Sequence, residues 1–179
     1  MERIFHLLRQ DKLRMKALEA VRDLSLPQCY IGAGFIRNLV WDNLHGKQEP
    51  TELNDIDVVY FDKSEVDIDC YATYESQLKC VIPALNWQVR NQAYMHQRNN
   101  HAPYQSTLEA ISQWIEQETA IAVRLKNDKE LDLISAFGIE SLFALHLTPN
   151  PNRDTAIFNH RIQTKNWLKT WPKLQVMKQ

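Results

Sequence analysis

Apolar residues recur every three or four positions over the first 26 residues, with charged residues between them. This spacing puts the apolar side chains on one face and predicts one or two amphipathic helices. Pro27 ends the pattern, because proline lacks an amide proton and pushes the preceding residue out of helical geometry. We therefore expect a helical segment over residues 1–26 and a new element after it.

A short strand, a tight turn and a helix are predicted after this proline. Residues 28–31 are mainly apolar and partly β-branched, and they run into a segment with two glycines. The helical pattern that follows extends to Leu44. Gly46 can close this helix, because glycine tolerates the left-handed conformation of a helix cap.

Strands and helices interleave along the rest of the chain. Residues 53–61 alternate and then become continuously apolar, which suits a strand that is buried toward its carboxyl end. Further strands are expected at 87–91, 120–125 and 130–134. Helices are expected at 64–81, around 94–96, at 107–117, at 139–147 and in the tail. Ser106 or Thr107 is the expected N-cap of the helix over 107–117.

The last two predicted strands form a hairpin, so part of the sheet is antiparallel. A fully parallel doubly wound sheet is therefore disfavoured, and we expect an α/β (α+β) fold with a mixed sheet flanked by helices. The 179 residues are enough for one substantial core and few for two. We expect a single domain over residues 1–179, with the helical segment 1–26 and a C-terminal helical tail over 152–179.

The composition argues against several classes of protein. The formal net charge of -1 gives no global field of the kind that marks proteins built to coat nucleic acid. No stretch approaches the ~20 apolar residues that cross a bilayer. The three cysteines are odd in number, and none lies in a CxxC pair. A reducing cytoplasm is the simplest location.

The most informative feature is Asp55-Ile56-Asp57, at the start of a predicted strand. Side chains two apart in a strand point to the same face, so these carboxylates can share hard cations. Their repulsion beside apolar sequence is costly unless a cation compensates it. Mg²⁺ prefers carboxylate oxygens together with phosphate oxygens of a substrate. When the two aspartates are taken alone, the alternative explanation is a turn in which Asp57 is exposed to solvent.

The turn Gly32-Ala33-Gly34 upstream favours the chemical interpretation. Its glycines let backbone amides approach a phosphate, and the N-terminus of the following helix is partly positive. Arg37 can add a charge-assisted contact. A tight turn with Arg37 on the helix surface is the alternative. The segment matches neither the dinucleotide fingerprint GxGxxG nor the phosphate loop GxxxxGK[ST].

The two segments carry a family resemblance. YIGAGFIRNLVWD at 30–42 and LNDIDV at 53–58 resemble the glycine turn and hDhDh pairing of the DNA polymerase β-like nucleotidyltransferase superfamily. The nearer similarity is to a bacterial family of small nucleotidyltransferase-like proteins. It spans about Leu13 to Leu174 and includes residues 87–96, 102–104, 136–138 and 171–174.

The turn is also similar to the GGxVRD pattern of tRNA nucleotidyltransferases. Ala33 stands in place of the second glycine and Asn38 in place of the aspartate. Together with the lack of a long helical tRNA-binding body, these departures argue against CCA addition.

The resemblance implies a set of catalytic and binding residues. Asp55 and Asp57 would hold two divalent cations, Mg²⁺ or Mn²⁺, with a third carboxylate on a neighbouring strand. Asp132 is the best-placed candidate for this catalytic metal ligand, and Glu130, which has the same facing, is the alternative. The alternative for Asp132 is that it is a hairpin residue whose side chain faces solvent. The nucleotide-binding residues would be Gly32, Gly34, Arg37, Asn91 and His96.

The implied function is metal-dependent transfer of a nucleoside monophosphate from a nucleoside triphosphate to an acceptor, with release of pyrophosphate. Because the net charge is near zero, a small acceptor is favoured over a nucleic acid, and no membrane partner is expected. A nucleotide-binding or partner-binding protein that keeps the fold without turnover is the alternative. The third carboxylate distinguishes these two hypotheses, because without it the acceptor hydroxyl is not activated for transfer.

Overall fold

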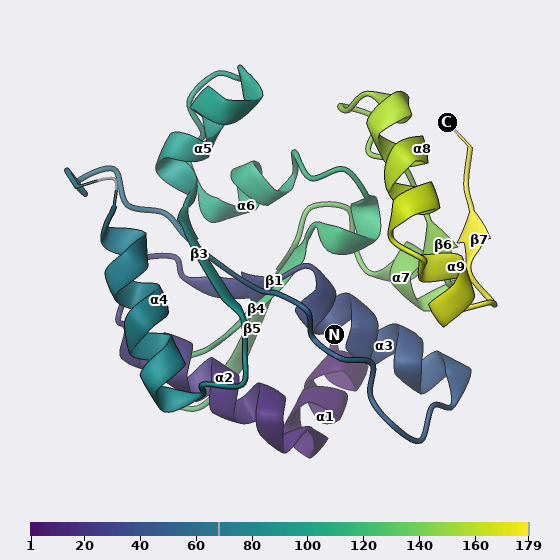
Figure 1. The fold of residues 1–179 in the computed structure, drawn as a ribbon, viewed down its shortest axis with the longest axis horizontal. Helices are drawn as coiled ribbons and strands as arrows, with labels where there is room; N and C mark the ends of the chain where they lie inside the picture. Colours follow the sequence, from purple (N-terminus) through teal and green to yellow (C-terminus); the bar gives the residue numbers. More distant parts are fainter. Residues whose placement is uncertain (68, 179) are drawn as a thin grey trace.

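The computed structural model describes residues 1–67 and 69–178, and five strands form its main sheet (Figure 1). The strand order is β3-β2-β1-β4-β5, where β1 is Tyr30–Gly32, β2 Ile56–Tyr60, β3 Trp87–Asn91, β4 Ile121–Leu125 and β5 Leu131–Ser135. β2 and β3 run parallel, whereas the other neighbouring pairs run antiparallel. The mixed sheet predicted from the hairpin is therefore confirmed.

Helices cover both faces of this sheet (Figure 1). One face carries α1 Glu2–Gln10, α2 Lys12–Asp23 and α4 Cys70–Val81, and the other carries α5 Gln92–Asn99 and α6 Thr107–Ile111. α3 Gly34–His45 follows β1 and ends at Gly46, whose φ of 65° is left-handed as predicted. Within the described residues, none of the helices has the length and apolarity that a membrane span requires.

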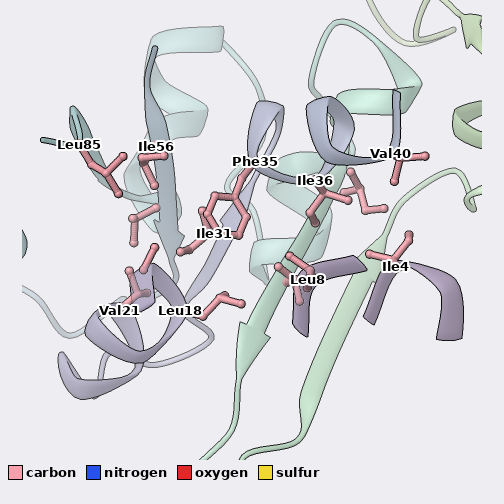
Figure 2. Close-up of a cluster of buried hydrophobic side chains, with 14 of the residues drawn as sticks. Ile4, Leu8, Leu18, Val21, Ile31, Phe35, Ile36, Val40, Ile56 and Leu85 are labelled. Carbon is pink, nitrogen blue, oxygen red and sulfur yellow. The ribbon is translucent and has the colours of Figure 1, made fainter. Parts of the chain in front are cut away.

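The main hydrophobic core lies between the sheet and the helices α1 to α4. Ile31 and Val58 are paired across β1 and β2, and both belong to this core, which Figure 2 shows around Ile31. The next pair, Tyr30 and Val59, packs on the opposite face with a residue of α6. Because strand side chains alternate, Asp57 points to the same face as Val59, away from the main core.

The end of the predicted helix over 139–147 is wrong. α7 covers Glu140–Phe143 and ends before Leu145, whose φ of 57° reverses the chain. β6, His146–Leu147, then pairs in parallel with β7, Gln175–Val176. The tail contains α8 Thr155–Thr164 and α9 Trp167–Thr170, so it is helical as far as residue 170 and then ends in a strand. Gln179 lies outside the described residues.

The helix expected over 64–81 begins only at Cys70. The side chain of Asp62 accepts hydrogen bonds from the backbone N–H and the hydroxyl of Ser64, at 2.8 and 2.6 Å, which holds that stretch in a turn. Ile68, within the predicted range, lies outside the described residues. The local polar contact therefore outweighs the weaker helical pattern.

The helix expected over 107–117 ends at Ile111. The side-chain amide of Asn150 donates to the backbone carbonyls of Ser112 and Trp114, at 2.7 and 2.6 Å. These carbonyls are thus occupied by a distant residue rather than by the next helical turn. The start of the helix agrees with the prediction, since the Ser106 side chain caps it.

A buried carboxylate ties α3 to two distant segments. Asp42 accepts hydrogen bonds from the backbone N–H and hydroxyl of Thr51, at 2.7 and 2.6 Å, and from the indole N–H of Trp171, at 2.7 Å. Lys47 Nζ lies 3.3 Å from the same carboxylate. Thr51 belongs to the segment that leads to Asp55, and Trp171 follows α9. Asp42 therefore anchors the segment before β2 and the segment after α9 to the same helix, α3.

We expect Asp42→Ala to lower the free energy of unfolding by about 2–4 kcal/mol, because it leaves several partly buried donors without an acceptor. Chemical denaturation of the variant and of the wild type measures this difference. Thr51→Val is the matched control, since it removes one donor and should cost about 1 kcal/mol. A loss of stability no larger for Asp42→Ala than for the control would contradict the anchoring role.

Candidate functional site

A cleft of about 510 Å³ lies between the start of α3, the segment before β2 and the C-terminal tail. Arg37, Asp55 and Asp57 all line this cleft, as do Ala33 and Gly34 of the turn after β1. The cleft therefore unites the aspartate pair and the turn, which are separated by some 20 residues of sequence. Their proximity follows from the antiparallel pairing of β1 and β2.

The turn after β1 is held by packing and carries backbone strain. At Gly32 a Cβ atom would lie 2.9 Å from the ring of Trp114 and 3.2 Å from the carbonyl oxygen of Ile121, so a larger residue does not fit. Ala33 has φ 53° and ψ −121°, a conformation that residues with a Cβ rarely adopt. Its N–H donates to the Ile121 carbonyl at 3.1 Å, which fixes the turn against β4.

Arg37 is a buried cation. It is 8% exposed, and its guanidinium lies 4.7 Å from the ring centroid of Trp167. Nη2 donates to the side-chain oxygen of Asn38 at 3.0 Å, whereas Nε is buried and has no hydrogen-bond partner among the described residues. Burial lowers the pKa of Arg37 to about 10, and the nearby charge of Glu116 opposes that shift. Arg37 stays protonated at neutral pH and, in the described part of the chain, forms no ion pair with a carboxylate.

The two aspartates lie in different surroundings. Asp55 is exposed and accepts a hydrogen bond from the side chain of Asn86 at 2.6 Å. Burial raises the pKa of Asp57, and the charge of Asp55 raises it further, whereas Arg37 lowers it. Among the described residues, no lysine or arginine forms an ion pair with either carboxylate. Two neighbouring carboxylates without a protein cation suit a hard divalent ion.

Asp132 does not join this pair. Its carboxylate forms an ion pair at 2.7 Å with Arg124 on the adjacent strand and accepts a hydrogen bond from the hydroxyl of Tyr30 at 3.2 Å. β5 is separated from β2 by β1 and β4, and each strand spacing is ~4.8 Å. Glu130 instead pairs with Lys126 at 3.0 Å.

The predicted cluster of three carboxylates is therefore not what the structure builds. Across residues 1–67 and 69–178, no three acidic, histidine or cysteine side chains are grouped so that they could hold a metal ion.

Asn91 and His96 support local structure and do not line the cleft. The Asn91 side chain caps α5 by accepting from the N–H of Ala93, and His96 Nδ1 lies 2.9 Å from the Ala93 carbonyl oxygen. Met95 and Asn99 of the same helix do line the cleft. The prediction thus selected the correct helix but not the face that meets the cleft.

The C-terminal tail supplies cleft residues that the sequence analysis missed. Arg161, Lys165 and Trp167 line the cleft, and Glu116, which is fully buried, accepts a hydrogen bond from Arg161 Nε at 2.5 Å. One signal was available in the sequence. Residues 152–178 contain six lysines and arginines against one acidic residue, Asp154, in a chain whose net charge is -1.

The model of a protein family described as nucleotidyltransferase matches residues 19–176 of the chain. The chain belongs to this nucleotidyltransferase family. A solved structure described as an NMR structure that reveals a CCA-adding enzyme head domain is 28% identical, with a TM-score of 0.87 over 100% of this chain and 96% of that one. The predicted polymerase β-like nucleotidyltransferase fold is thereby confirmed.

Larger enzymes share the fold at lower identity. A CCA-adding enzyme in complex with CTP is 12% identical, with a TM-score of 0.62 over 98% of this chain and 43% of that one. A tRNA nucleotidyltransferase in complex with a primer tRNA and an incoming ATP analogue is 16% identical, with a TM-score of 0.56 over 90% and 46%. The chain thus spans less than half of the length of each of these two enzymes. No curated protein matches its sequence.

We expect Ala33→Gly to stabilise the protein by about 1 kcal/mol, because glycine relieves the strain at φ 53°. Thermal and chemical denaturation measure the change. Ala72→Gly, in the exposed part of α4, is the matched control and should lower stability by roughly 0.5–1 kcal/mol. If both substitutions destabilise equally, Ala33 carries no strain.

Proposed function

We propose that this protein transfers a nucleoside monophosphate from a nucleoside triphosphate to an acceptor, with a divalent cation bound by Asp55 and Asp57. One observation carries the proposal: a single cleft brings together Asp55 and Asp57, which form no ion pair with the described residues, and the buried guanidinium of Arg37, whose Nε meets no acceptor among those residues. A metal-bound triphosphate satisfies both, since the cation relieves the carboxylate repulsion and the phosphates offer acceptors to Arg37.

The donor set fits Mg²⁺ or Mn²⁺. Asp55 and Asp57 offer carboxylate oxygens, and Mg²⁺ takes its remaining ligands from water and substrate phosphates rather than from an all-protein cage. A divalent ion held by Asp55 and Asp57 would lower the pKa of an acceptor hydroxyl and neutralise charge on the triphosphate.

The residues of the chain hold and orient the nucleotide. Gly34 brings the N-terminus of α3 to the cleft wall, where backbone N–H groups favour an anion, and Arg37 adds a fixed positive charge. The acceptor oxygen bonds to the α-phosphorus while the bond from that phosphorus to the bridging oxygen of the β-phosphate breaks. Pyrophosphate leaves with the bridging oxygen, and the hydroxyl proton passes to water beside the exposed Asp55. Most of the rate enhancement comes from orientation of the substrates and from electrostatic stabilisation of the transition state.

The related structures change the expected acceptor. The small net charge favoured a small molecule, but the similar solved proteins are described as CCA-adding or tRNA-processing enzymes. The basic tail beside the cleft agrees with a polyanionic acceptor. We therefore propose an RNA hydroxyl as the first acceptor to test and a small metabolite as the second.

Nucleotide binding without turnover is the second candidate function. It is favoured by the position of Asp132, whose ion pair with Arg124 keeps this carboxylate away from Asp55 and Asp57, and by the lack of any three-residue metal-binding group among the described residues. Such a protein would bind a metal-bound nucleotide through Asp55, Asp57 and Arg37 and release no pyrophosphate. Binding and pyrophosphate release, measured together, separate the two functions.

We expect the purified protein to release pyrophosphate from at least one labelled nucleoside triphosphate, in the presence of Mg²⁺ or Mn²⁺ and either deproteinised tRNA or a metabolite extract. Asp55→Ala combined with Asp57→Ala should lower the rate at least about 100-fold. Equal pyrophosphate release by wild type and this variant would refute the catalytic assignment.

Asp132→Asn is the matched control for the same assay. Because Asp132 is paired with Arg124 and lies outside the cleft, its variant should keep the wild-type rate once a small loss of stability is accounted for. A loss as large as that of the double variant would mean that Asp132 acts in the reaction and that its position changes during it.

Asp57→Asn should stabilise the metal-free protein by about 0.5–1 kcal/mol, because it removes a charge that burial disfavours. The sign follows from the raised pKa of Asp57: the folded state holds its proton more tightly than the unfolded state, so stability falls as the pH rises through this pKa. Thermal unfolding in EDTA and in Mg²⁺ measures both effects. Mg²⁺ should raise the Tm of the wild type but not of the variant, and an equal Mg²⁺ response would rule out binding at Asp57.

A further inference from the structure

Arg153 lines the cleft at the opposite end of α8 from Arg37. Arg153 comes just before α8, whereas the guanidinium carbon of Arg37 lies 4.7 Å from the ring centroid of Trp167, at the start of α9. α8 has 10 residues and is therefore about 15 Å long. Figure 1 shows that α8 leads to α9, close to α3, and that its start is farther from α3. The cleft therefore has two cationic ends, of which the proposed reaction uses one.

Arg153 has a neutral hydrogen-bond partner instead of a carboxylate. In the part of the chain that the structure describes, it forms no ion pair. Asp154, its neighbour in the sequence, caps α8 by accepting from the N–H of Ala156 at 2.7 Å. Nη1 of Arg153 lies 3.2 Å from Nε2 of His101. This contact uses one of the five N–H donors of a guanidinium, so Arg153 can still donate to an anion in the cleft.

The ring of His101 is the neutral tautomer that carries its proton on Nδ1. Arginine can only donate, so Nε2 of His101 must accept, which leaves the ring proton on Nδ1. Nδ1 lies 2.7 Å from the hydroxyl oxygen of Tyr104 and donates to it, and the side-chain amide of Asn99 donates to the same oxygen at 3.2 Å. Tyr104 is 3% exposed and belongs to an apolar cluster with residues of α5 and α6. Hydrogen bonds thus connect Arg153 to a fixed, buried support.

A neutral partner holds the guanidinium without cancelling its charge. A carboxylate in place of His101 would also orient Arg153, but its negative charge would oppose an anionic ligand. The imidazole fixes the side chain before a ligand arrives, which lowers the entropic cost of binding. Asn99, a member of the same hydrogen-bond network, also lines the cleft. Such a place suits a phosphate group, which arginine binds through two parallel N–H donors.

We propose that His101 is a positioning residue that holds Arg153 for the binding of a phosphate group at this end of the cleft. The proposal rests on the proposed function for the place of the triphosphate, at Arg37, Asp55 and Asp57. A triphosphate is much shorter than α8, so the phosphate at Arg153 belongs to another group. It is either a phosphodiester of an RNA or the phosphomonoester of a small molecule.

The test measures the binding of two probes by isothermal titration of the full chain, at mildly alkaline pH. The probes are the RNA trinucleotide UpUpU, which has phosphodiesters but no terminal phosphate, and ribose 5-phosphate, and at least one of them should bind. Arg153→Met should weaken that binding about 10-fold, because charge-assisted hydrogen bonds are lost. His101→Leu should weaken it about 3- to 10-fold. His101→Gln, whose side-chain oxygen can accept from Arg153, should stay within about 2-fold of the wild type.

Two controls accompany these variants. Arg98→Met removes an exposed arginine of α5 that does not line the cleft, and it should bind both probes within about 2-fold of the wild type. Tripolyphosphate with Mg²⁺ reports on the Arg37 end of the cleft, and Arg153→Met should bind it within about 2-fold of the wild type. A loss of tripolyphosphate binding as large as that of the probe would overturn the proposal, because Arg153 would then belong to the triphosphate site.

The ring nitrogens of His101 give a second measurement. In nitrogen NMR spectra of the wild type, Nδ1 should be protonated and Nε2 should be an acceptor, and the Nε2 signal should shift in Arg153→Met because its donor is removed. A histidine that only supports the loop through Tyr104 would show no such shift. A ring protonated on Nε2 in the wild type would contradict the positioning role.

The binding results decide the proposal as follows. Dependence of UpUpU binding on Arg153 assigns the site to a phosphodiester, and dependence of ribose 5-phosphate binding assigns it to a phosphomonoester. Four results overturn it: no binding of either probe, unchanged binding by Arg153→Met, an equal loss for Arg98→Met, or a loss for His101→Gln as large as that for His101→Leu.

The nucleotide assay separates this proposal from the proposed function, because probe binding needs no turnover. If no nucleoside triphosphate is turned over but probe binding depends on Arg153 and His101, the phosphate site stands and the transfer reaction is refuted. If transfer occurs and Arg153→Met leaves the KM for the acceptor and the binding of both probes unchanged, the transfer stands and the phosphate site is refuted.

Discussion

The cleft depends on keeping opposite charges close together without letting them pair. Arg37 is buried among aromatic rings and Asp57 is half-buried on β2, and each perturbs the pKa of the other, yet neither forms an ion pair with the described residues. A direct salt bridge would be the cheaper arrangement for an isolated fold. The separation is maintained by rigid elements: the turn fixed against β4 at Ala33 and the tail anchored through Asp42.

Features that rest on local sequence were predicted well. The alternation around Ile56 identifies β2, the polar stretch before Glu130 identifies the hairpin, and Gly46 identifies the end of α3. The same local reasoning correctly brings Asp55, Asp57 and Arg37 to one place, because a strand, a turn and a helix in succession put both segments at one end of neighbouring strands. Family membership followed from the same residues.

Features that rest on distant contacts were not predictable from the sequence. Asn150 ends α6 by binding carbonyls almost 40 residues away, and β6 exists only because Gln175–Val176 pairs with it. Asp132 has the alternating apolar context of a site residue, but its strand is at the edge and its partner is Arg124. The contribution of Arg161 depends on the fold of the tail, and periodicity carries no information about which cleft a helix will cover.

The late position of the tail in the sequence has a consequence for biogenesis. All five strands of the main sheet lie before residue 136, whereas the cleft cations Arg161 and Lys165 come from the end of α8 and the residue that follows it. During synthesis all five of these strands therefore leave the ribosome before the residues that form this wall of the cleft. The cleft is complete only after the tail has been made and Trp171 has reached Asp42.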